Sequence, residues 1–187
     1  ITDEHGTEML KLFYMNQKVC AFAFQMMAYI SRLAGLRKII RDNQDKDIII
    51  ITERSLYTDK YIFEKMLYDQ GKIKEYEHKI YLMWFDEFAK DFDINDVIYI
   101  KTEPTKCYER IHLRAREGEE FIPLAYLEEC HTYHEAFLDP NSGLFKQQLV
   151  LDGNQDILKN ETILCERLKQ IDDFIMPEQN KHFVYEI

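Results

Sequence analysis

The fold prediction starts from residues 47–59, DIIIITERSLYTD. Its four consecutive isoleucines, Ile48 to Ile51, are β-branched and apolar on both faces, which predicts a strand buried on both sides in a parallel sheet. Glu53, Arg54 and Ser55 follow, beyond the carboxyl end of that strand, where open α/β sheets bind ligands. A carboxylate and a guanidinium there could hold a metal and an anionic oxygen. A solvated charged turn before the next helix explains the same residues equally well.

The rest of the chain alternates helical and strand patterns. The periodicity predicts helices over residues 8–42 (with a break near Asn16), 58–68, 75–90, 104–116 and 161–175. Further strands are expected at 96–101, 149–151 and 182–187. This alternation implies βαβ crossovers and a parallel sheet. At 187 residues, one domain spanning residues 1–187 is the default expectation.

The composition argues against several classes of binding partner. The net charge of −10, without a basic tract, argues against binding a nucleic-acid polymer, since phosphate contacts depend on Lys and Arg. The four cysteines are scattered and form no C-x-x-C pair, which predicts reduced thiols in a cytoplasmic protein rather than a zinc site. We also expect no membrane partner, because no apolar run approaches the roughly 18–20 residues that span a bilayer.

Two helices carry polar side chains at informative spacing. On the first, Gln25 and Arg32 lie two turns apart on one strip with the small Ala28 between them. The commoner explanation is a helix with a polar edge, and the alternative is that both side chains face a cleft.

The helix over 104–116 carries Arg110 and Arg114 one turn apart, with Arg116 at or past its end. Three converging guanidiniums could enclose a polyphosphate and offset charge in phosphoryl transfer. An exposed helix whose arginines pair with neighbouring glutamates is the usual explanation of such a pattern.

Four segments, taken together, resemble the deoxynucleoside kinase family, which includes deoxycytidine, deoxyguanosine and insect-type multisubstrate kinases. They are FAFQMMAYISR (22–32), ERSLYTDKYIF (53–63), YERIHLRAREGEEFIPLAYLEECHTYHE (108–135) and LDGNQDI (151–157). The resemblance implies an α/β P-loop kinase-like fold, with a parallel sheet flanked by helices. It also implies transfer of the ATP γ-phosphoryl group to a deoxynucleoside 5′-hydroxyl with Mg²⁺, as in nucleotide salvage.

The same resemblance assigns a base pocket. Gln25 matches the glutamine that reads the base edge, and Arg32 and Asp59 match the arginine and aspartate that line the pocket in deoxycytidine and deoxyguanosine kinases. Phe24 and Phe63 match aromatics that sandwich the base, although packing in the core would explain them too. This set implies a preference for deoxycytidine or a purine deoxynucleoside over thymidine.

Sugar and phosphate contacts also follow from the resemblance. Tyr14 and Glu119 match residues that contact the sugar 3′-hydroxyl. Glu53 matches the acidic residue on the metal side, and Arg54 the arginine near the 5′-oxygen and phosphates. The arginines matching the lid are Arg110, Arg114 and Arg116. The loop that lies against the adenine of ATP corresponds to Asp152, Gly153, Asn154, Asp156 and Ile157.

Two parts of the family pattern are absent from the 187 residues: a G-x-x-x-x-G-K-[ST] phosphate loop, and the upstream Glu-Pro segment whose glutamate is the family's general base. We therefore expect that the first strand and the P-loop lie outside this sequence, and that activity requires the missing N-terminal segment. The alternative is a catalytically silent homologue that binds a nucleoside or nucleotide. Family resemblance also suggests a homodimer.

Overall fold

The computed structural model describes residues 1–176 except 91, 93, 95 and 117–118. The predicted strand at 182–187 lies outside the described residues. In chain order the elements are α1 (Met9–Met15), α2 (Gln17–Asp42), α3 (Leu56–Thr58), the π-helix η1 (Asp59–Glu64), α4 (Lys65–Asp69), α5 (Glu75–Phe88), β1 (Asp96–Lys101), α6 (Pro104–Arg114), the 3₁₀-helix η2 (Glu119–Phe121), α7 (Leu124–Phe137), the 3₁₀-helix η3 (Pro140–Ser142), β2 (Gln147–Asp152) and α8 (Glu161–Ile175).

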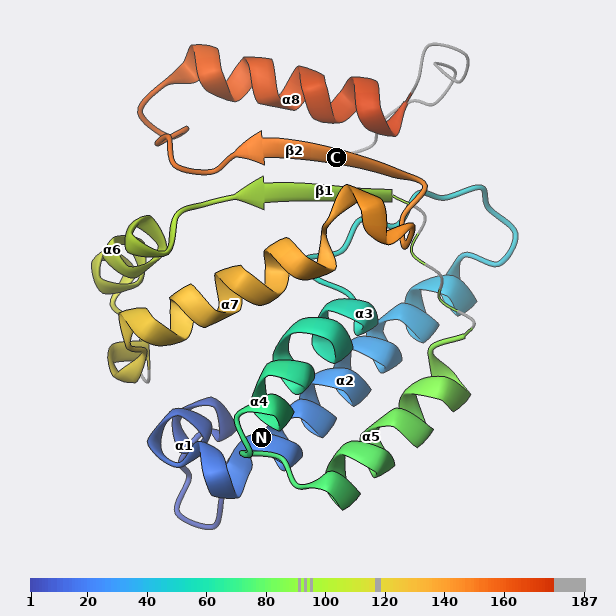
Figure 1. Cartoon of the computed structure of the whole chain (residues 1–187). Helices are drawn as coiled ribbons and strands as arrows, with labels where there is room; N and C mark the ends of the chain where they lie inside the picture. The colour runs from blue at the N-terminus through green and yellow to red at the C-terminus, as the bar shows by residue number, and fades with distance from the viewer. Residues whose placement is uncertain (91, 93, 95, 117–118, 177–187) are drawn as a thin grey trace.

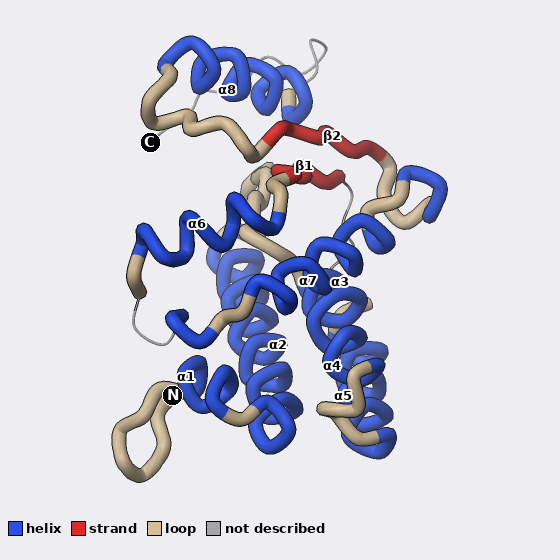
Figure 2. The backbone as a smooth tube through the Cα atoms, turned by 60° about the vertical axis from the view of Figure 1, so that its left-hand side comes forward, coloured by secondary structure: helices blue, strands red, loops and turns tan. Residues whose placement is uncertain are grey.

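Two parallel strands form the sheet among the described residues. β1 and β2 pair in register, with Ile98 opposite Leu149 and Lys101 opposite Asp152. The chain crosses from one strand to the other through α6 and α7, as a parallel pair requires. α8 lies beyond β2, and the other helices lie on the β1 side (Figures 1 and 2). The predicted α/β architecture with a parallel sheet is confirmed.

The isoleucine run is not a strand. Residues 48–51 have no regular secondary structure, and Ile49 and Ile51 are 59% and 69% exposed. β-propensity describes how well a residue fits a pleated, half-buried surface, so a strand needs a neighbour to pair with. β1 pairs with β2, and within the described residues no strand pairs with this run. The prediction of a doubly buried strand is therefore wrong for the chain in this structure.

The first two helices are divided at Asn16, as predicted. The Asn16 N–H donates to the carbonyl of Leu12 in α1, and its own carbonyl accepts from the N–H groups of Val19 and Cys20 in α2. One residue therefore closes the first helix and opens the second.

The long helix α2 has the length and apolar composition of a membrane-spanning segment, which corrects the expectation that no stretch approaches one. A single such helix is weak evidence of a membrane, because the core helix of a soluble protein passes the same test. One face of α2 does contribute to the interior here. Its buried residues recur every four positions: Ala21, Gln25, Tyr29 and Leu33.

The segment after the isoleucines is one helical run with a π-helical centre. Ser55 caps its start by accepting a hydrogen bond from the N–H of Thr58, so the helix predicted over 58–68 begins two residues earlier, at Leu56. Backbone angles stay helical through Asp59 and Lys65, which join α3, η1 and α4. The run ends before Gly71, whose φ of +67° suits glycine.

Two groups of buried side chains hold this run in place. Leu56 packs with Tyr29 of α2 and Tyr81 of α5, whereas Ile62 of η1 packs with Phe137 and Leu138 at the end of α7. Burying each such side chain stabilises the fold by about 1.5–3 kcal/mol. The helical run is thus packed against α2 and α5 through α3 and against α7 through η1. The helix α7, which completes this arrangement, was not among the predicted helices.

Gly153, directly after β2, is the glycine that packing requires. Its N–H donates to the Lys101 carbonyl at 2.6 Å, and an added Cβ would lie 1.9 Å from Oγ1 of Thr102. We expect Gly153→Ala to lower the free energy of unfolding by about 1–3 kcal/mol, measured by urea denaturation.

Gly35 provides the matched control. It lies inside α2, where an added Cβ would meet nothing within 4 Å. Gly35→Ala should raise the free energy of unfolding by up to about 1 kcal/mol, because Ala favours a helix interior over Gly. Equal stability of the two variants would contradict the close approach at Gly153.

Candidate functional site

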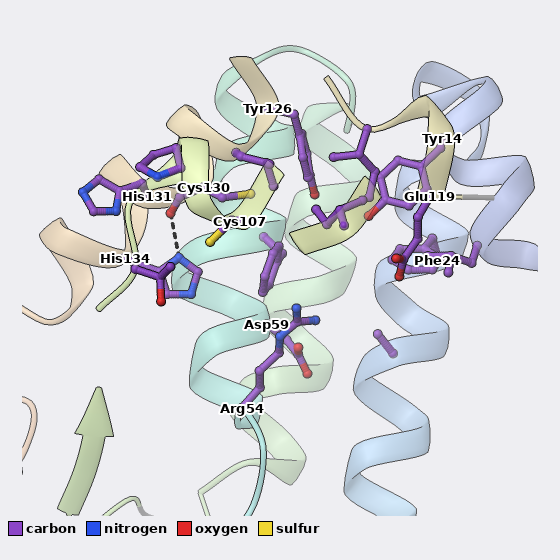
Figure 3. Close-up of a pocket in the computed structure, with 18 of the residues that line it drawn as sticks. Tyr14, Phe24, Arg54, Asp59, Cys107, Glu119, Tyr126, Cys130, His131 and His134 are labelled. Atoms are coloured by element: carbon purple, nitrogen blue, oxygen red, sulfur yellow. Dashed lines mark hydrogen bonds between the residues drawn. The ribbon is translucent and has the colours of Figure 1, made fainter. Parts of the chain in front are cut away.

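A cavity of 370 Å³ lies between α2, η1, α6, α7 and the carboxyl end of β1. Figure 3 shows Tyr14, Phe24 and Glu119 along one side of it, and Cys107, Cys130, His131 and His134 along the other. Asp59 and Arg54 lie between these two groups. A concave site lined by aromatic side chains and a few polar groups is typical of small-molecule binding.

The polar strip of α2 forms one wall of this cavity. Gln25, Ala28 and Arg32 all line it, so the strip faces a cleft rather than a solvated edge. Gln25 is only 2% exposed although its amide is polar. A buried amide that offers one donor and one acceptor group is suited to recognising the edge of a planar ligand.

An ion pair joins α2 to the π-helix. Arg32 Nε donates to Oδ2 of Asp59 at 2.9 Å, and Arg32 Nη1 donates to the Glu53 carbonyl at 2.7 Å. Asp59 is 2% exposed. Burial raises the pKa of Asp59, while the hydrogen bond and charge of Arg32 act in the opposite direction. Arg32 therefore provides the main compensation for burying this carboxyl group.

Aromatic rings form two other walls. Phe24 stacks on Phe13 with 4.4 Å between ring centroids, and Phe63 meets His134 edge-on at 5.9 Å. Phe24 and Phe63 both line the cavity, and they come from different elements, α2 and η1. The contact of Phe24 with Phe13 also belongs to a core cluster, so packing accounts for part of its role.

The turn formed by Glu53 and Arg54 contributes one of its two charged residues to the cavity. Arg54 has a φ of +63°, which is rare for a residue with a side chain, and its guanidinium lies 4.7 Å from the centre of the Phe63 ring. Arg54 lines the cavity, whereas Glu53 is exposed and is not among its lining residues. In the described part of the chain, no group of three or more His, Cys, Asp or Glu side chains could hold a metal ion.

The three lid arginines do not converge. Arg114 Nη2 donates to Oε2 of Glu119 at 2.7 Å, and Arg116 lies 3.5 Å from the other carboxylate oxygen. Arg110 instead donates to the carbonyls of Gly153, Asn154 and Gln155 at 2.7–3.3 Å. The predicted cluster of three is therefore a cluster of two. Arg110 is the one that leaves the cluster, because the carbonyls after β2 lie within its reach. Arg114 ends α6, and the chain turns at the left-handed Ala115 (φ +49°), which leaves Arg116 beside Glu119 as well.

The loop predicted to contact adenine lies outside the cavity and is attached to the start of α6. Asn154 Oδ1 accepts from the Glu103 N–H at 2.8 Å, and the Asp152 carboxylate accepts from the Asn154 N–H at 2.9 Å. Asp156 pairs with Lys159. Together with Arg110, these bonds fix the loop against the helix that carries the lid arginines. Five residues predicted for the loop are absent from the cavity lining: Asp152, Gly153, Asn154, Asp156 and Ile157.

Sequence reasoning missed one wall of the cavity, which α7 and α6 supply. Cys130, His131 and His134 come from α7, and Cys107 comes from α6. Spacings of three residues (His131 to His134) and four residues (Cys130 to His134) would have placed these side chains near one face if that helix had been predicted. Burial raises the pKa of Cys130 to about 11, which makes its thiol a poor nucleophile at neutral pH. Burial also lowers the pKa of His134, whose Nδ1–H donates to the Cys130 carbonyl.

Comparison with known proteins assigns the family. The family model described as deoxynucleoside kinase matches residues 2–176. The chain belongs to the deoxynucleoside kinase family. It is 33% identical over 184 residues to deoxycytidine kinase from Rattus norvegicus, covering 90% of this chain and 70% of the relative. It is 34% identical over 138 residues to mitochondrial deoxyguanosine kinase from Xenopus laevis, covering 70% and 51%.

The same family fold appears in a solved structure, deoxyadenosine kinase from M. mycoides with bound dCTP. The two share a TM-score of 0.68 at 22% identity, over 86% of this chain and 79% of the other. This similarity confirms the P-loop kinase-like α/β fold.

The contribution of the buried Arg32–Asp59 pair to stability can be tested by substitution. Arg32→Met leaves Asp59 buried without its partner and should lower the free energy of unfolding by about 3 kcal/mol or more. Arg32→Met with Asp59→Ala removes both charges and should recover a large part of that loss in urea denaturation.

Lys38→Ala supplies the control on the same helix. The Lys38–Asp42 pair is exposed (70% and 46% for the two side chains), so its loss should change the free energy of unfolding by less than about 1 kcal/mol. An Arg32→Met variant no less stable than Lys38→Ala would show that the buried pair is not what stabilises η1.

Proposed function

We propose that this protein is a deoxynucleoside kinase that transfers the ATP γ-phosphoryl group to the 5′-hydroxyl of deoxycytidine or a purine deoxynucleoside. The observation that carries this proposal is the buried Arg32–Asp59 pair, which lines the same cavity as Gln25. The names of the relatives, deoxycytidine kinase and deoxyguanosine kinase, agree with such a substrate. We place the reaction in nucleotide salvage, in the cytoplasm.

Base recognition follows from the hydrogen-bonding capacity of the three polar groups. When it is ionised, the Asp59 carboxylate only accepts hydrogen bonds, so it favours a base with an exocyclic amino group. Arg32 neutralises Asp59 and can also donate to a ring nitrogen or carbonyl. Thymine presents the acceptor O4 where cytosine presents an amino donor, and an unmet buried polar group costs about 1–3 kcal/mol. Gln25 does not discriminate, because its amide can flip.

Sugar recognition is proposed for Tyr14 and Glu119, which lie close together on the side of the cavity that also holds Phe24 (Figure 3). Burial is the main cause that raises the pKa of Tyr14 to about 12, so its hydroxyl keeps its proton at neutral pH and can donate to the 3′-hydroxyl. Glu119 is 6% exposed and would accept from that hydroxyl. Phe24 and Phe63 would hold the base between them.

Phosphoryl transfer needs positive charge near the 5′-oxygen. Arg54 lines the cavity, and Arg114 and Arg116 both pair with Glu119. We assign these three guanidiniums to the 5′-oxygen and phosphates, where they would offset developing charge. Arg110 would act indirectly, because it binds the loop proposed to contact adenine.

ATP and Mg²⁺ are proposed as the donor and its metal. Mg²⁺ is commonly held by one or two carboxylates together with substrate phosphates. The single exposed carboxylate of Glu53 fits that kind of site, and not a cage built by protein groups alone. When bound, the ion would neutralise charge on the phosphates. We further propose that activity requires a phosphate loop and general base beyond the 187 residues. We also propose that residues 1–187 form one domain, that the protein is a homodimer, and that it binds neither a nucleic-acid polymer nor a membrane.

A measurement of base preference tests this function. In competition among the four deoxynucleosides, the full-length enzyme should prefer deoxycytidine or a purine deoxynucleoside over thymidine by about tenfold or more in kcat/KM. The double variant Arg32→Met, Asp59→Ala should shift the ranking toward thymidine. Thymidine as the best substrate of the unmutated enzyme would refute the assignment. Residues 1–187 alone, assayed alongside, are expected to show no turnover.

The lid assignment makes a separate prediction. Arg114→Ala should lower kcat by about 10²-fold or more while KM for the nucleoside changes little, because a contact with the transferring phosphate acts on the transition state. Steady-state kinetics at varied nucleoside concentration measure both.

Lys106→Ala is the control on the same helix, since Lys106 forms a pair with Glu109 and lies outside the cavity. A near-normal kcat with a raised nucleoside KM for Arg114→Ala would mean that Arg114 serves mainly to hold Glu119 toward the sugar.

A further inference from the structure

A second buried carboxylate lies at the end of the π-helix and takes no part in the cavity. Glu64, the last residue of η1, is 1% exposed, and its Oε1 lies 2.8 Å from Nδ1 of His78 on α5. The His78 ring stacks on Tyr68 at 3.9 Å between centroids, with 9° between planes. A buried carboxylate persists in a fold when it is partnered. His78 is that partner, and its orientation is fixed by the Tyr68 ring.

The same face of α5 also contacts the start of the π-helix. Tyr81 follows His78 by three residues and is 1% exposed. Burial raises the pKa of Tyr81, and the next causes are the charges of Asp59 and Glu64. Within the described residues, neither the Tyr81 hydroxyl nor Oε2 of Glu64 has a hydrogen-bond partner. Both carboxylates of η1 therefore lie near one face of α5, and of the two only Asp59 lines the cavity.

Two pairs restrain the π-helix at its ends. A π-helix forms i→i+5 hydrogen bonds in place of the i→i+4 bonds of an α-helix, and such segments are rare and frequently lie at functional sites. In η1 the Arg32–Asp59 pair holds the first residue, and the Glu64–His78 pair holds the last. Relaxation by one residue would rotate one end relative to the other by about 100°. That rotation would move Phe63, which precedes Glu64, relative to Asp59.

We propose that the Glu64–His78 hydrogen bond positions the base pocket from behind, by holding η1 in the π-helical register that directs Asp59 and Phe63 into the cavity together. This inference rests on the proposed function, because it assigns the pair to base recognition. Glu64 and His78 are positioning residues: neither lines the cavity.

Two substitutions of His78 separate positioning from packing, tested on the full-length protein by calorimetric titration with each of the four deoxynucleosides. His78→Phe keeps a ring against Tyr68 but removes the nitrogen that bonds Glu64. It should weaken binding of the preferred nucleoside about tenfold and compress the ranking among bases. His78→Asn keeps a nitrogen donor near the Nδ1 position and should stay within about threefold of the unmutated protein.

Lys79→Ala is the matched control on the next residue of α5. It breaks the exposed Lys79–Glu75 pair and should leave affinity and ranking unchanged. Circular dichroism checks that each variant is folded. If His78→Phe does not fold, the double variant Glu64→Leu, His78→Phe replaces the pair with apolar side chains, a change that buried pairs commonly tolerate. It should show the same loss of affinity and ranking.

The outcomes separate this inference from the function on which it rests. Unchanged affinity and ranking in folded His78→Phe, or in the double variant, would overturn the positioning role while leaving the kinase proposal intact. Equal losses in His78→Phe and His78→Asn would also overturn it, since the hydrogen bond would then not be the cause. If the unmutated protein bound no deoxynucleoside, the proposed function would fail, and this inference with it.

Discussion

The buried ion pair between Arg32 and Asp59 is the interaction on which the site depends. A carboxyl group that is 2% exposed is compatible with the fold because a guanidinium from another helix lies 2.9 Å away. The same guanidinium donates to the carbonyl of Glu53. One side chain of α2 therefore holds both the first residue of the π-helix and the turn before it. Through that turn it also sets where Arg54 enters the cavity.

The π-helix explains how a short segment supplies two kinds of wall. Asp59 and Phe63 both line the cavity, since four residues of helical backbone separate them and bring them close to one face. Packing of Ile62 against Phe137 and Leu138 fixes the side of η1 toward α7. The Glu64–His78 bond connects its end to α5. Neighbouring elements thus hold a backbone form that the local sequence alone would not maintain.

The lid region shows a different use of charge. Arg114 and Arg116 lie on either side of Glu119, whereas Arg110 binds three carbonyls of the loop after β2. The close approach of Gly153 to Thr102 connects that loop to the end of β1. A movement of α6 would therefore displace both Glu119, in the cavity, and the loop after β2. This mechanical link follows from hydrogen bonds to backbone, which carry no sequence signature.

Much of the architecture was determined by the sequence itself. Apolar periodicity and capping residues are local properties, so they correctly placed the break at Asn16, the strand Asp96–Lys101 and the helix Glu161–Ile175. The spacing of Gln25, Ala28 and Arg32 put three side chains on one strip, because helical geometry leaves no other arrangement. The motifs also predicted the family, and the match of the family model over residues 2–176 confirms that prediction.

The tertiary structure decided those features that depend on which elements pack beside one another. Ile48 to Ile51 has high strand propensity, yet without a strand beside it the run stays irregular and mostly exposed. The three arginines of this region lie within seven residues of sequence, yet they bind two different partners. Arg110 binds carbonyls after β2, and Arg114 and Arg116 bind the Glu119 carboxylate. Glu64 and His78 are fourteen residues apart and show no local pattern. Their pairing exists only because α5 packs against the π-helix, which brings a buried carboxylate and an imidazole within 2.8 Å.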